Sequence, residues 1–218
     1  ATGQELNIVE LNLKTARLDG QTPGDVSLSA RITGKNPVVD LRAQAAGALR
    51  FNLRREEFAF DKFGAQVKGR LDQDTISAEF SAPKVEVTPA KASGSEVKGS
   101  IQVRGPQRNV DARLLIAAVE GTATALTIPK VSLDLDAAIA GISAKARIEA
   151  AIKANLAKQD LNAEVSGKLD ESSLKAKIRL TNFAPLTANF EVNVDRLNLD
   201  RYLPAERKDV KSDERIDL

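Results

Sequence analysis

The chain has 218 residues and contains neither cysteine nor histidine, which excludes several kinds of chemistry. Without cysteine there can be no disulfide, no thiolate nucleophile and no thiolate metal site. Without histidine the commonest general base and metal ligand is missing, and no Ser-His-Asp triad can be built. The sequence also lacks the G-x-S-x-G motif of hydrolases. We therefore predict a protein that is not an enzyme, with no catalytic residue, no metal site and no cofactor.

Bulky side chains are scarce as well. Trp and Met are absent, and there are one Tyr and seven Phe, although 42% of the residues are hydrophobic. The apolar content is therefore mostly Ala, Leu, Val and Ile. A compact sandwich core is usually built around aromatic side chains that bury about 150–250 Å² each. This composition favours a strongly curved, thinly packed sheet.

Neither sign of charge is in large excess, because the chain has 32 basic and 30 acidic residues and a net charge of +2. A nucleic-acid-binding protein normally carries a basic surplus with interleaved aromatic residues, so we predict no nucleic-acid partner. No apolar run is long enough for a membrane-spanning helix. There is no signal peptide and no initiator Met, which indicates a processed chain or a fragment of a longer protein.

The dominant pattern is alternation with period two. From Val39 to Leu53 every odd position is apolar or Gly, and most even positions are polar. Successive side chains of a strand point to opposite faces, so this segment predicts one half-buried strand. Its length of roughly 50 Å, at about 3.3 Å per residue, far exceeds that of an ordinary strand.

The same alternation recurs along the chain, and residues typical of turns separate the alternating runs. The runs are Val26–Ile32, Ile76–Phe80, Val131–Ile139 and Leu174–Leu180, with turns at 34–37, 72–74, 105–109 and 170–172. Parallel pairing would need long crossovers, which are absent. The predicted fold is all-β: a long, curved antiparallel sheet of about a dozen strands built from repeated hairpins, either a β-groove or an open β-sandwich-like sheet.

One Ala-rich segment, Ser143–Lys158, fits two structures. Ile148, Ile152 and Leu156 would share one face of a helix. Read at period two, Ala144 to Leu156 instead alternates with charged and polar residues. We interpret the segment as a strand, because the alternation is long and its neighbours are all strands.

A short repeat suggests that the sheet grew by duplication. Ala65–Asp72 (AQVKGRLD) matches Ala163–Asp170 (AEVSGKLD), and an alternating strand follows each copy. We predict a single repeating domain over 1–204. The charge-dense stretch 205–218 is predicted to be a linker or a disordered tail.

The remaining motifs give only weak support for a binding site. Gly64–Arg70 has the glycine spacing of a phosphate-binding loop, but Arg70 stands where the motif needs Lys. Asp134 and Asp136 share one strand face and could hold Ca²⁺, although a solvent-facing polar edge explains them better. Asp72 and Asp74 are interpreted as turn residues.

The apolar face of these strands is the one remaining candidate site, because it must be covered by something. A second sheet of the same chain, a partner protein or lipid could cover it. The predicted lining residues of a lipid groove are Leu41, Ala45, Leu49, Phe51, Phe80, Ile116, Leu133, Ile148, Val165, Ile178 and Phe190.

The segment Val194–Pro204 (VDRLNLDRYLP) resembles the AsmA family of bacterial envelope proteins, as does the hairpin Gly167–Asp170. The resemblance implies a repeating β-groove related to the TamB and VPS13-type lipid-transfer proteins. It also implies a periplasmic location and a role in phospholipid transport and outer-membrane homeostasis. The family's N-terminal inner-membrane anchor is absent from this chain, and the family offers no catalytic residues to carry over.

Three functions follow as hypotheses. The first is binding or conducting phospholipid, or another lipid with acyl chains, along the apolar groove. The alternative is a scaffold that holds outer-membrane or other envelope proteins by adding strands to an exposed sheet edge. A third, an adhesin-like stalk, predicts a sealed sandwich with no groove.

Overall fold

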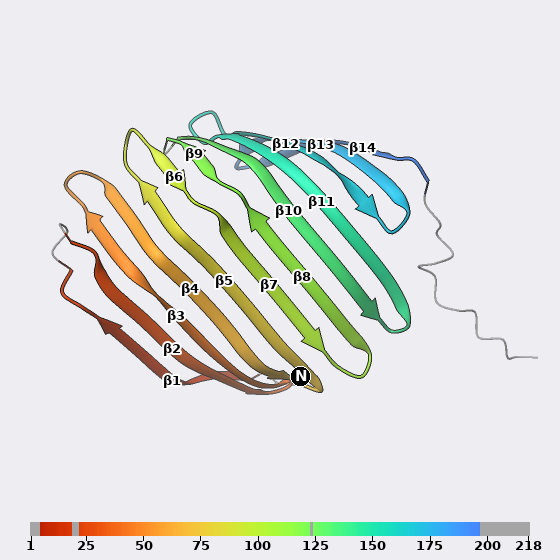
Figure 1. Ribbon diagram of the computed structural model, residues 1–218, viewed down its shortest axis with the longest axis horizontal. Coiled ribbons are helices and arrows are strands. Elements are labelled where there is room, and N and C mark those ends of the chain that lie inside the picture. The colour runs from red at the N-terminus through yellow and green to blue at the C-terminus, as the bar shows by residue number, and fades with distance from the viewer. Residues whose placement is uncertain (1–4, 19–21, 123, 197–218) are drawn as a thin grey trace, which may run out of the picture.

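The computed structural model describes residues 5–18, 22–122 and 124–196, and these residues form one antiparallel sheet of 14 strands (Figure 1). The first seven strands are β1 (Leu6–Thr15), β2 (Gly24–Lys35), β3 (Val38–Asn52), β4 (Glu57–Leu71), β5 (Asp74–Val87), β6 (Ala92–Gly94) and β7 (Val97–Arg104). The other seven are β8 (Arg108–Ile116), β9 (Val119–Gly121), β10 (Ala125–Ile139), β11 (Ile142–Asn155), β12 (Asp160–Leu169), β13 (Ser172–Phe183) and β14 (Leu186–Val194). The predicted all-β sheet of repeated hairpins is confirmed.

Four of the strands occupy only two positions across the sheet. β6 and β7 both pair with β5 and continue one another along it, with a break at residues 95–96. β8 and β9 continue one another along β10 in the same way. The 14 strands therefore fill twelve positions, in agreement with the predicted dozen.

The Ala-rich segment 143–158 is a strand rather than a helix over nearly all its length. Its residues form β11, which pairs along its whole length with β10 and over most of it with β12. Ala has a weak preference for strands, but two neighbouring strands satisfy the backbone of this segment, and tertiary context overrides such preferences.

The sequence repeat corresponds to a repeated hairpin turn. Asp72 and Asp170 both adopt positive φ, 54° and 52°. The carboxylate of Asp72 accepts a hydrogen bond of 2.8 Å from the backbone N–H of Val38, and that of Asp170 accepts one of 2.8 Å from Lys145. Each Asp therefore fastens its turn to the strand that precedes the hairpin, because Asp both tolerates this conformation and supplies an acceptor.

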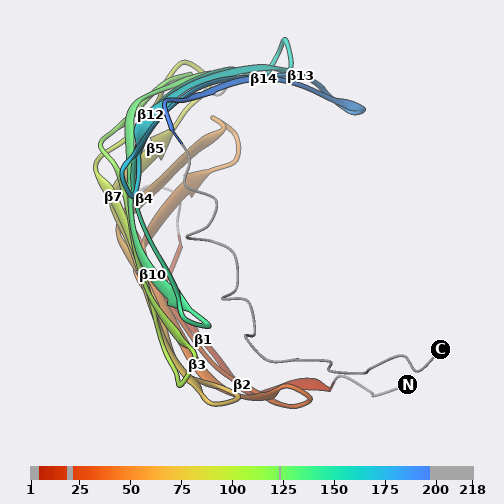
Figure 2. The same cartoon turned by 90° about the vertical axis from the view of Figure 1, so that its right-hand side faces the viewer.

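The sheet is strongly curved and forms a single layer. Seen from its right-hand end it has the outline of a C, with β1 and β2 near one tip and β13 and β14 near the other (Figure 2). The C encloses a wide trough. A sealed sandwich would need a second layer, which the described residues do not contain. The stalk hypothesis therefore loses its structural basis.

The core of this sheet is thin. Its buried hydrophobic residues are only Val and Ala, and no large side chain is fully buried among the described residues. The members are Val39, Ala59, Ala82, Ala92, Val97, Ala146 and Ala163. Stability must therefore come largely from the backbone ladder and from cross-strand side-chain pairs.

Candidate functional site: the apolar face of the sheet

Apolar side chains line up in rows that cross the sheet at right angles to the strands. Residues directly opposite each other in a ladder point to the same face, so the register identifies each row. The longest row crosses all twelve positions through Leu13, Leu28, Ala45, Ala65, Phe80, Gly99, Leu114, Leu133, Ile148, Gly167, Leu174 and Val194. We call the side of the sheet that carries this row the apolar face.

The ladders place every predicted lining residue on this same face. Ala45, Phe80, Leu133 and Ile148 belong to the row just described. Leu41 lies two residues along β3 from Ala43, which is itself two residues from Ala45. The others join parallel rows through the pairs Leu49–Phe60, Phe51–Phe58, Val97–Ile116, Ala150–Val165, Ala163–Ile178 and Ile178–Phe190.

Some lining residues were missed by the sequence reading, above all the phenylalanines of β4. The rings of Phe60 and Phe63 lie edge to face with centroids 5.9 Å apart, and those of Phe63 and Phe80 are 6.0 Å apart. Phe60 and Phe63 have opposite parity in the sequence, so simple alternation assigns them to opposite faces. An irregularity in the β3–β4 register, with positive φ at Lys62, brings both rings together.

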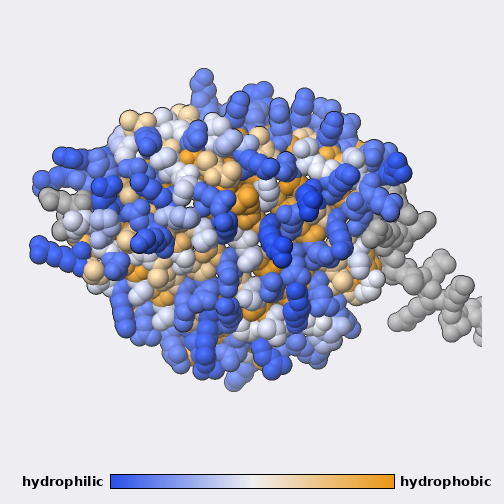
Figure 3. All heavy atoms as spheres, in the orientation of Figure 1, coloured by the Kyte–Doolittle hydropathy of each residue, from blue (hydrophilic) through white to orange (hydrophobic). Residues whose placement is uncertain are grey.

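The apolar face is the concave one. Figures 1 and 2 together show that the viewer of Figure 1 looks at the convex side of the C. Figure 3 shows that hydrophilic side chains dominate this side. The apolar rows occupy the opposite side of the strands and therefore line the inside of the trough.

Large apolar side chains within the trough remain open to solvent. Phe80 is 41% exposed, Ile101 is 49% exposed and Phe190 is 75% exposed. Isolated exposed apolar residues are common, but a contiguous apolar surface of this extent marks a binding surface in a soluble domain. The trough is therefore the candidate site.

The convex face, which we call the polar face, is held by ion pairs across neighbouring strands. The guanidinium of Arg31 donates two hydrogen bonds to Asp40, of 2.9 and 3.0 Å, and these lower the pKa of the Asp40 carboxyl below its ordinary value. Asp134 accepts a hydrogen bond of 2.8 Å from Arg147 and raises the pKa of that guanidinium.

The two aspartates considered as Ca²⁺ ligands are thus engaged in ion pairs, because Asp136 also lies 2.9 Å from the Lys145 ammonium. Among the residues described, no three His, Cys, Asp or Glu side chains are grouped so as to hold a metal ion. Gly64–Arg70, the segment with phosphate-loop spacing, lies within β4 and forms no loop.

A crevice of about 1210 Å³ is lined mostly by residues of the polar face, together with six members of the apolar row: Leu28, Ala45, Ala65, Phe80, Gly99 and Leu114. It runs across β1 to β11 over small residues such as Ser27, Ala46, Gly64 and Ser81. Lys98, Arg113 and Glu149 are among the charged residues along it. The orange patches visible between hydrophilic side chains in Figure 3 show where the polar cover of this face is thin.

The chain matches no family profile, and neither a curated protein nor a solved structure shows significant similarity to it. Most of the segment that resembles AsmA proteins, from residue 197 onward, and the predicted tail 205–218 lie outside the described residues. The described part of the chain has no helix of the length and apolarity needed to cross a bilayer.

Proposed function

We propose that the trough binds the acyl chains of phospholipid, and that the chain is a non-enzymatic, periplasmic part of a membrane-anchored, AsmA-like envelope protein with a role in outer-membrane homeostasis. The observation that carries the proposal is the apolar row that crosses the whole concave face, in which Leu28, Phe80 and Val194 remain exposed. The resemblance noted in the sequence supports the envelope location.

The chemistry of the trough suits an acyl chain. Burying one methylene group yields about 0.8 kcal/mol, so laying eight of them on this face yields roughly 6 kcal/mol. Two Ala and two Gly lie among the larger apolar residues of the row, which leaves room for a flexible chain between the larger side chains. No charged residue belongs to the row, so a charged headgroup would remain in solvent.

Two neighbouring residues of β7 allow a matched test. Ile101 points into the trough, and Gln102 pairs with Asp111 on the polar face. We expect Ile101→Asp to lower the phospholipid retained by the purified chain at least about fivefold, because an unpaired carboxylate under an acyl chain costs more than about 1 kcal/mol. Gln102→Asp adds the same charge to the other face and should leave retention unchanged.

Retained lipid is measured by native mass spectrometry and by organic extraction, and circular dichroism checks that both variants fold. If Ile101→Asp folds and retains as much lipid as the unchanged chain, the trough is not the lipid site. Equal losses in both variants would also contradict the proposal.

A second candidate function is the scaffold, which the two edges of the sheet favour. Every residue of β1 and of β14 is exposed, and within residues 5–196, apart from the gaps at 19–21 and 123, no strand pairs with the outer backbone groups of either. Such edges accept an added strand. Capture of envelope-protein peptides, lost when Pro is placed in β1 or β14 but kept in Ile101→Asp, would favour this function over the first.

A further inference from the structure

The hairpin loops of the sheet gather at its two ends, and the ends differ in charge. Because the strands alternate in direction, successive turns lie at opposite ends of the strands. One set comprises the described residues 16–18, 22–23, 53–56, 88–91, 122, 124, 156–159 and 184–185. The other comprises residue 5 and residues 36–37, 72–73, 105–107, 140–141, 170–171 and 195–196.

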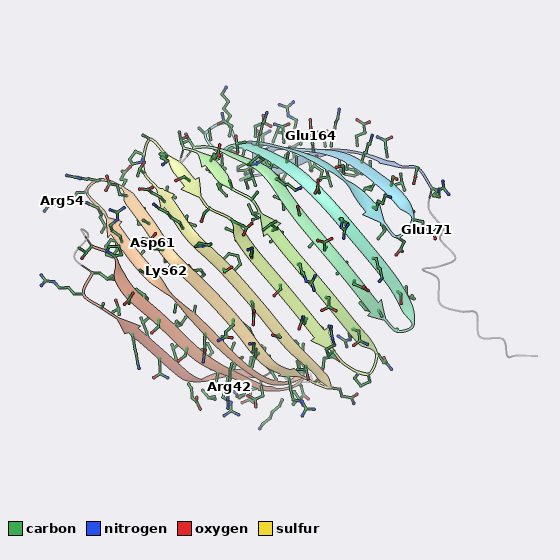
Figure 4. All side chains as sticks on the ribbon, in the orientation of Figure 1. Arg42, Arg54, Asp61, Lys62, Glu164 and Glu171 are labelled. Atoms are coloured by element: carbon green, nitrogen blue, oxygen red, sulfur yellow. The ribbon has the colours of Figure 1, made fainter. Side chains whose placement is uncertain are left out.

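The first set of described loop residues is basic and the second is acidic. The first contains five basic side chains against a single acidic one, Glu56; they are Arg17, Arg54, Arg55, Lys91 and Lys158. The second contains five acidic side chains against a single basic one, Arg196; they are Glu5, Asp72, Asp170, Glu171 and Asp195. We call these the basic end and the acidic end. Figure 4 shows Arg54 and Glu171 at opposite ends of the sheet.

The basic side chains of the first set are available to a partner. Within the described part of the chain none of them takes part in an ion pair, whereas many charged residues of the strands do. All five are exposed. No described acidic side chain therefore neutralises their charge in an ion pair.

Apolar residues accompany these charges. Leu53, in the same turn as Arg54 and Arg55, is 71% exposed, and Leu156, in the same turn as Lys158, is 41% exposed. The loops of the acidic end contain no Leu, Ile, Val or Phe among their described residues. Exposed leucines next to lysines and arginines are typical of segments that lie in the interface of an anionic membrane.

The aromatic part of the trough adjoins the same end. Phe51 and Phe58, which face each other in the β3–β4 ladder, border the turn at 53–56. Phe60 follows and begins the ring contacts that lead through Phe63 to Phe80. A lipid entering from the basic end would thus meet the largest apolar side chains of the trough first.

We propose that the basic end docks on the surface of an anionic phospholipid bilayer and turns the aromatic mouth of the trough toward it. This inference rests on the proposed lipid-binding function, and it adds the end of the sheet from which lipid enters the trough. Leucines 53 and 156 insert at the level of the headgroups, the basic side chains contact lipid phosphates, and the acidic end points away from the membrane.

The test uses the 218-residue chain and vesicles of phosphatidylcholine, with or without phosphatidylglycerol. The docking variant carries Arg54→Gln, Arg55→Gln and Lys158→Gln. Each basic residue near an anionic surface contributes about fivefold to binding, so we expect the variant to bind phosphatidylglycerol vesicles on the order of 100-fold more weakly. The unchanged chain should bind them more tightly than pure phosphatidylcholine vesicles, and added salt should weaken the binding.

The matched control carries Lys153→Gln, Lys168→Gln and Lys175→Gln, which removes the same charge from exposed positions of the polar face. Its vesicle binding should stay close to that of the unchanged chain. Equal weakening in both variants, or no preference of the unchanged chain for phosphatidylglycerol, overturns the proposal.

A second measurement separates docking from lipid binding. Uptake of a dispersed lysophospholipid below its micellar concentration needs no bilayer surface. The docking variant should take it up normally, whereas Ile101→Asp should not. Loss of uptake in the docking variant would show that its substitutions damage the trough, and would contradict the docking proposal. Normal uptake in Ile101→Asp would contradict the lipid site in the trough, and the vesicle measurements would still test docking.

Discussion

The hairpins β4–β5 and β12–β13 contain the two copies of the sequence repeat. Comparing them shows which residues the turn requires and which residues differ between the two positions in the sheet. Both carry the turn Asp at positive φ, and both carry a Gly three residues before it, Gly69 and Gly167. The apolar contents diverge, since Phe80 of β5 corresponds to Ile178 of β13. Within the repeat, the shared Ala, Val, Gly and Leu lie on the apolar face, and the residues that differ, at Gln66, Lys68 and Arg70, lie on the polar face.

The divergence extends to the buried polar residue after each turn. Asp74 and Ser172 are both 6% exposed and both pair with a Leu across the hairpin, Leu71 and Leu169. Asp74 has a cation nearby, because the Arg108 guanidinium lies 3.4 Å from its carboxylate. The first residue after each turn is therefore a small polar one, and it is charged where the neighbouring strand supplies a cation, as Arg108 does for Asp74.

The largest effect is expected at the two shared glycines. A Cβ on Gly69 would lie 2.0 Å from the carbonyl oxygen of Asp40, and one on Gly167 would lie 2.2 Å from that of Arg147. The obstacle is backbone in both cases, so we expect Gly69→Ala and Gly167→Ala each to lower the free energy of unfolding by about 2–3 kcal/mol. Urea denaturation followed by circular dichroism measures this.

Gly64 provides the control within β4, because the nearest atom to its added Cβ is 3.9 Å away. Gly64→Ala should change the free energy of unfolding by less than about 0.5 kcal/mol. If only one of the two shared glycines proves sensitive, the hairpins are not equivalent in their packing against β3 and β11.

A smaller effect is expected at the turn aspartates. Asp72→Ala and Asp170→Ala each remove a hydrogen bond to the preceding strand and place Ala at positive φ, and we expect a loss of about 1–2 kcal/mol from each. Gln73→Ala and Glu171→Ala, one residue further along each turn, are the controls and should be near neutral. Equal losses at control and target would show that the turn as a whole, rather than the Asp, is responsible.

The smallest effect concerns pH and distinguishes the surroundings of the two hairpins. Next to the first, the pKa of Asp40 is lowered chiefly by its hydrogen bonds from Arg31. Next to the second, the pKa of Asp195 is lowered chiefly by a hydrogen bond from the backbone of Ser173, 2.8 Å long. Since both folded-state pKa values lie below the unfolded ones, the stability that these groups contribute is complete above the unfolded value and is lost as the pH falls through the folded one.

Salt separates the two contributions. High salt should raise the Asp40 pKa toward its ordinary value, because an exposed ion pair is screened, and should leave that of Asp195 nearly unchanged. Titration of both carboxyl carbons by NMR, in low and high salt, measures the difference. An equal response of the two groups would mean that Asp195 depends on a charged partner as well.

The alternation of apolar residues was sufficient to predict the strands and which residues share a face, because the pleat of a strand fixes the side on which each residue lies. It failed around Lys62, where an irregular register brings Phe60 and Phe63 to one face and no local pattern reveals the shift. The groove interpretation places the apolar face inside the curve and the charged residues outside, and the sheet curves in that sense. The difference in charge between the two ends was not predicted, because Arg54 and Lys158 are far apart in the sequence and lie at the same end of the sheet only through the alternation of turns.

Because the antiparallel sheet has twelve positions, an even number, its first strand begins and its last strand ends at the same end of the sheet. Leu6 at the start of β1 and Val194 at the close of β14 both lie at the acidic end. At the basic end, each described loop connects two successive strands of the sheet. Any polypeptide joined to either end of the sheet therefore begins at the acidic end, opposite the turns that carry Leu53 and Leu156. A tether attached there would leave the basic end free to contact a surface.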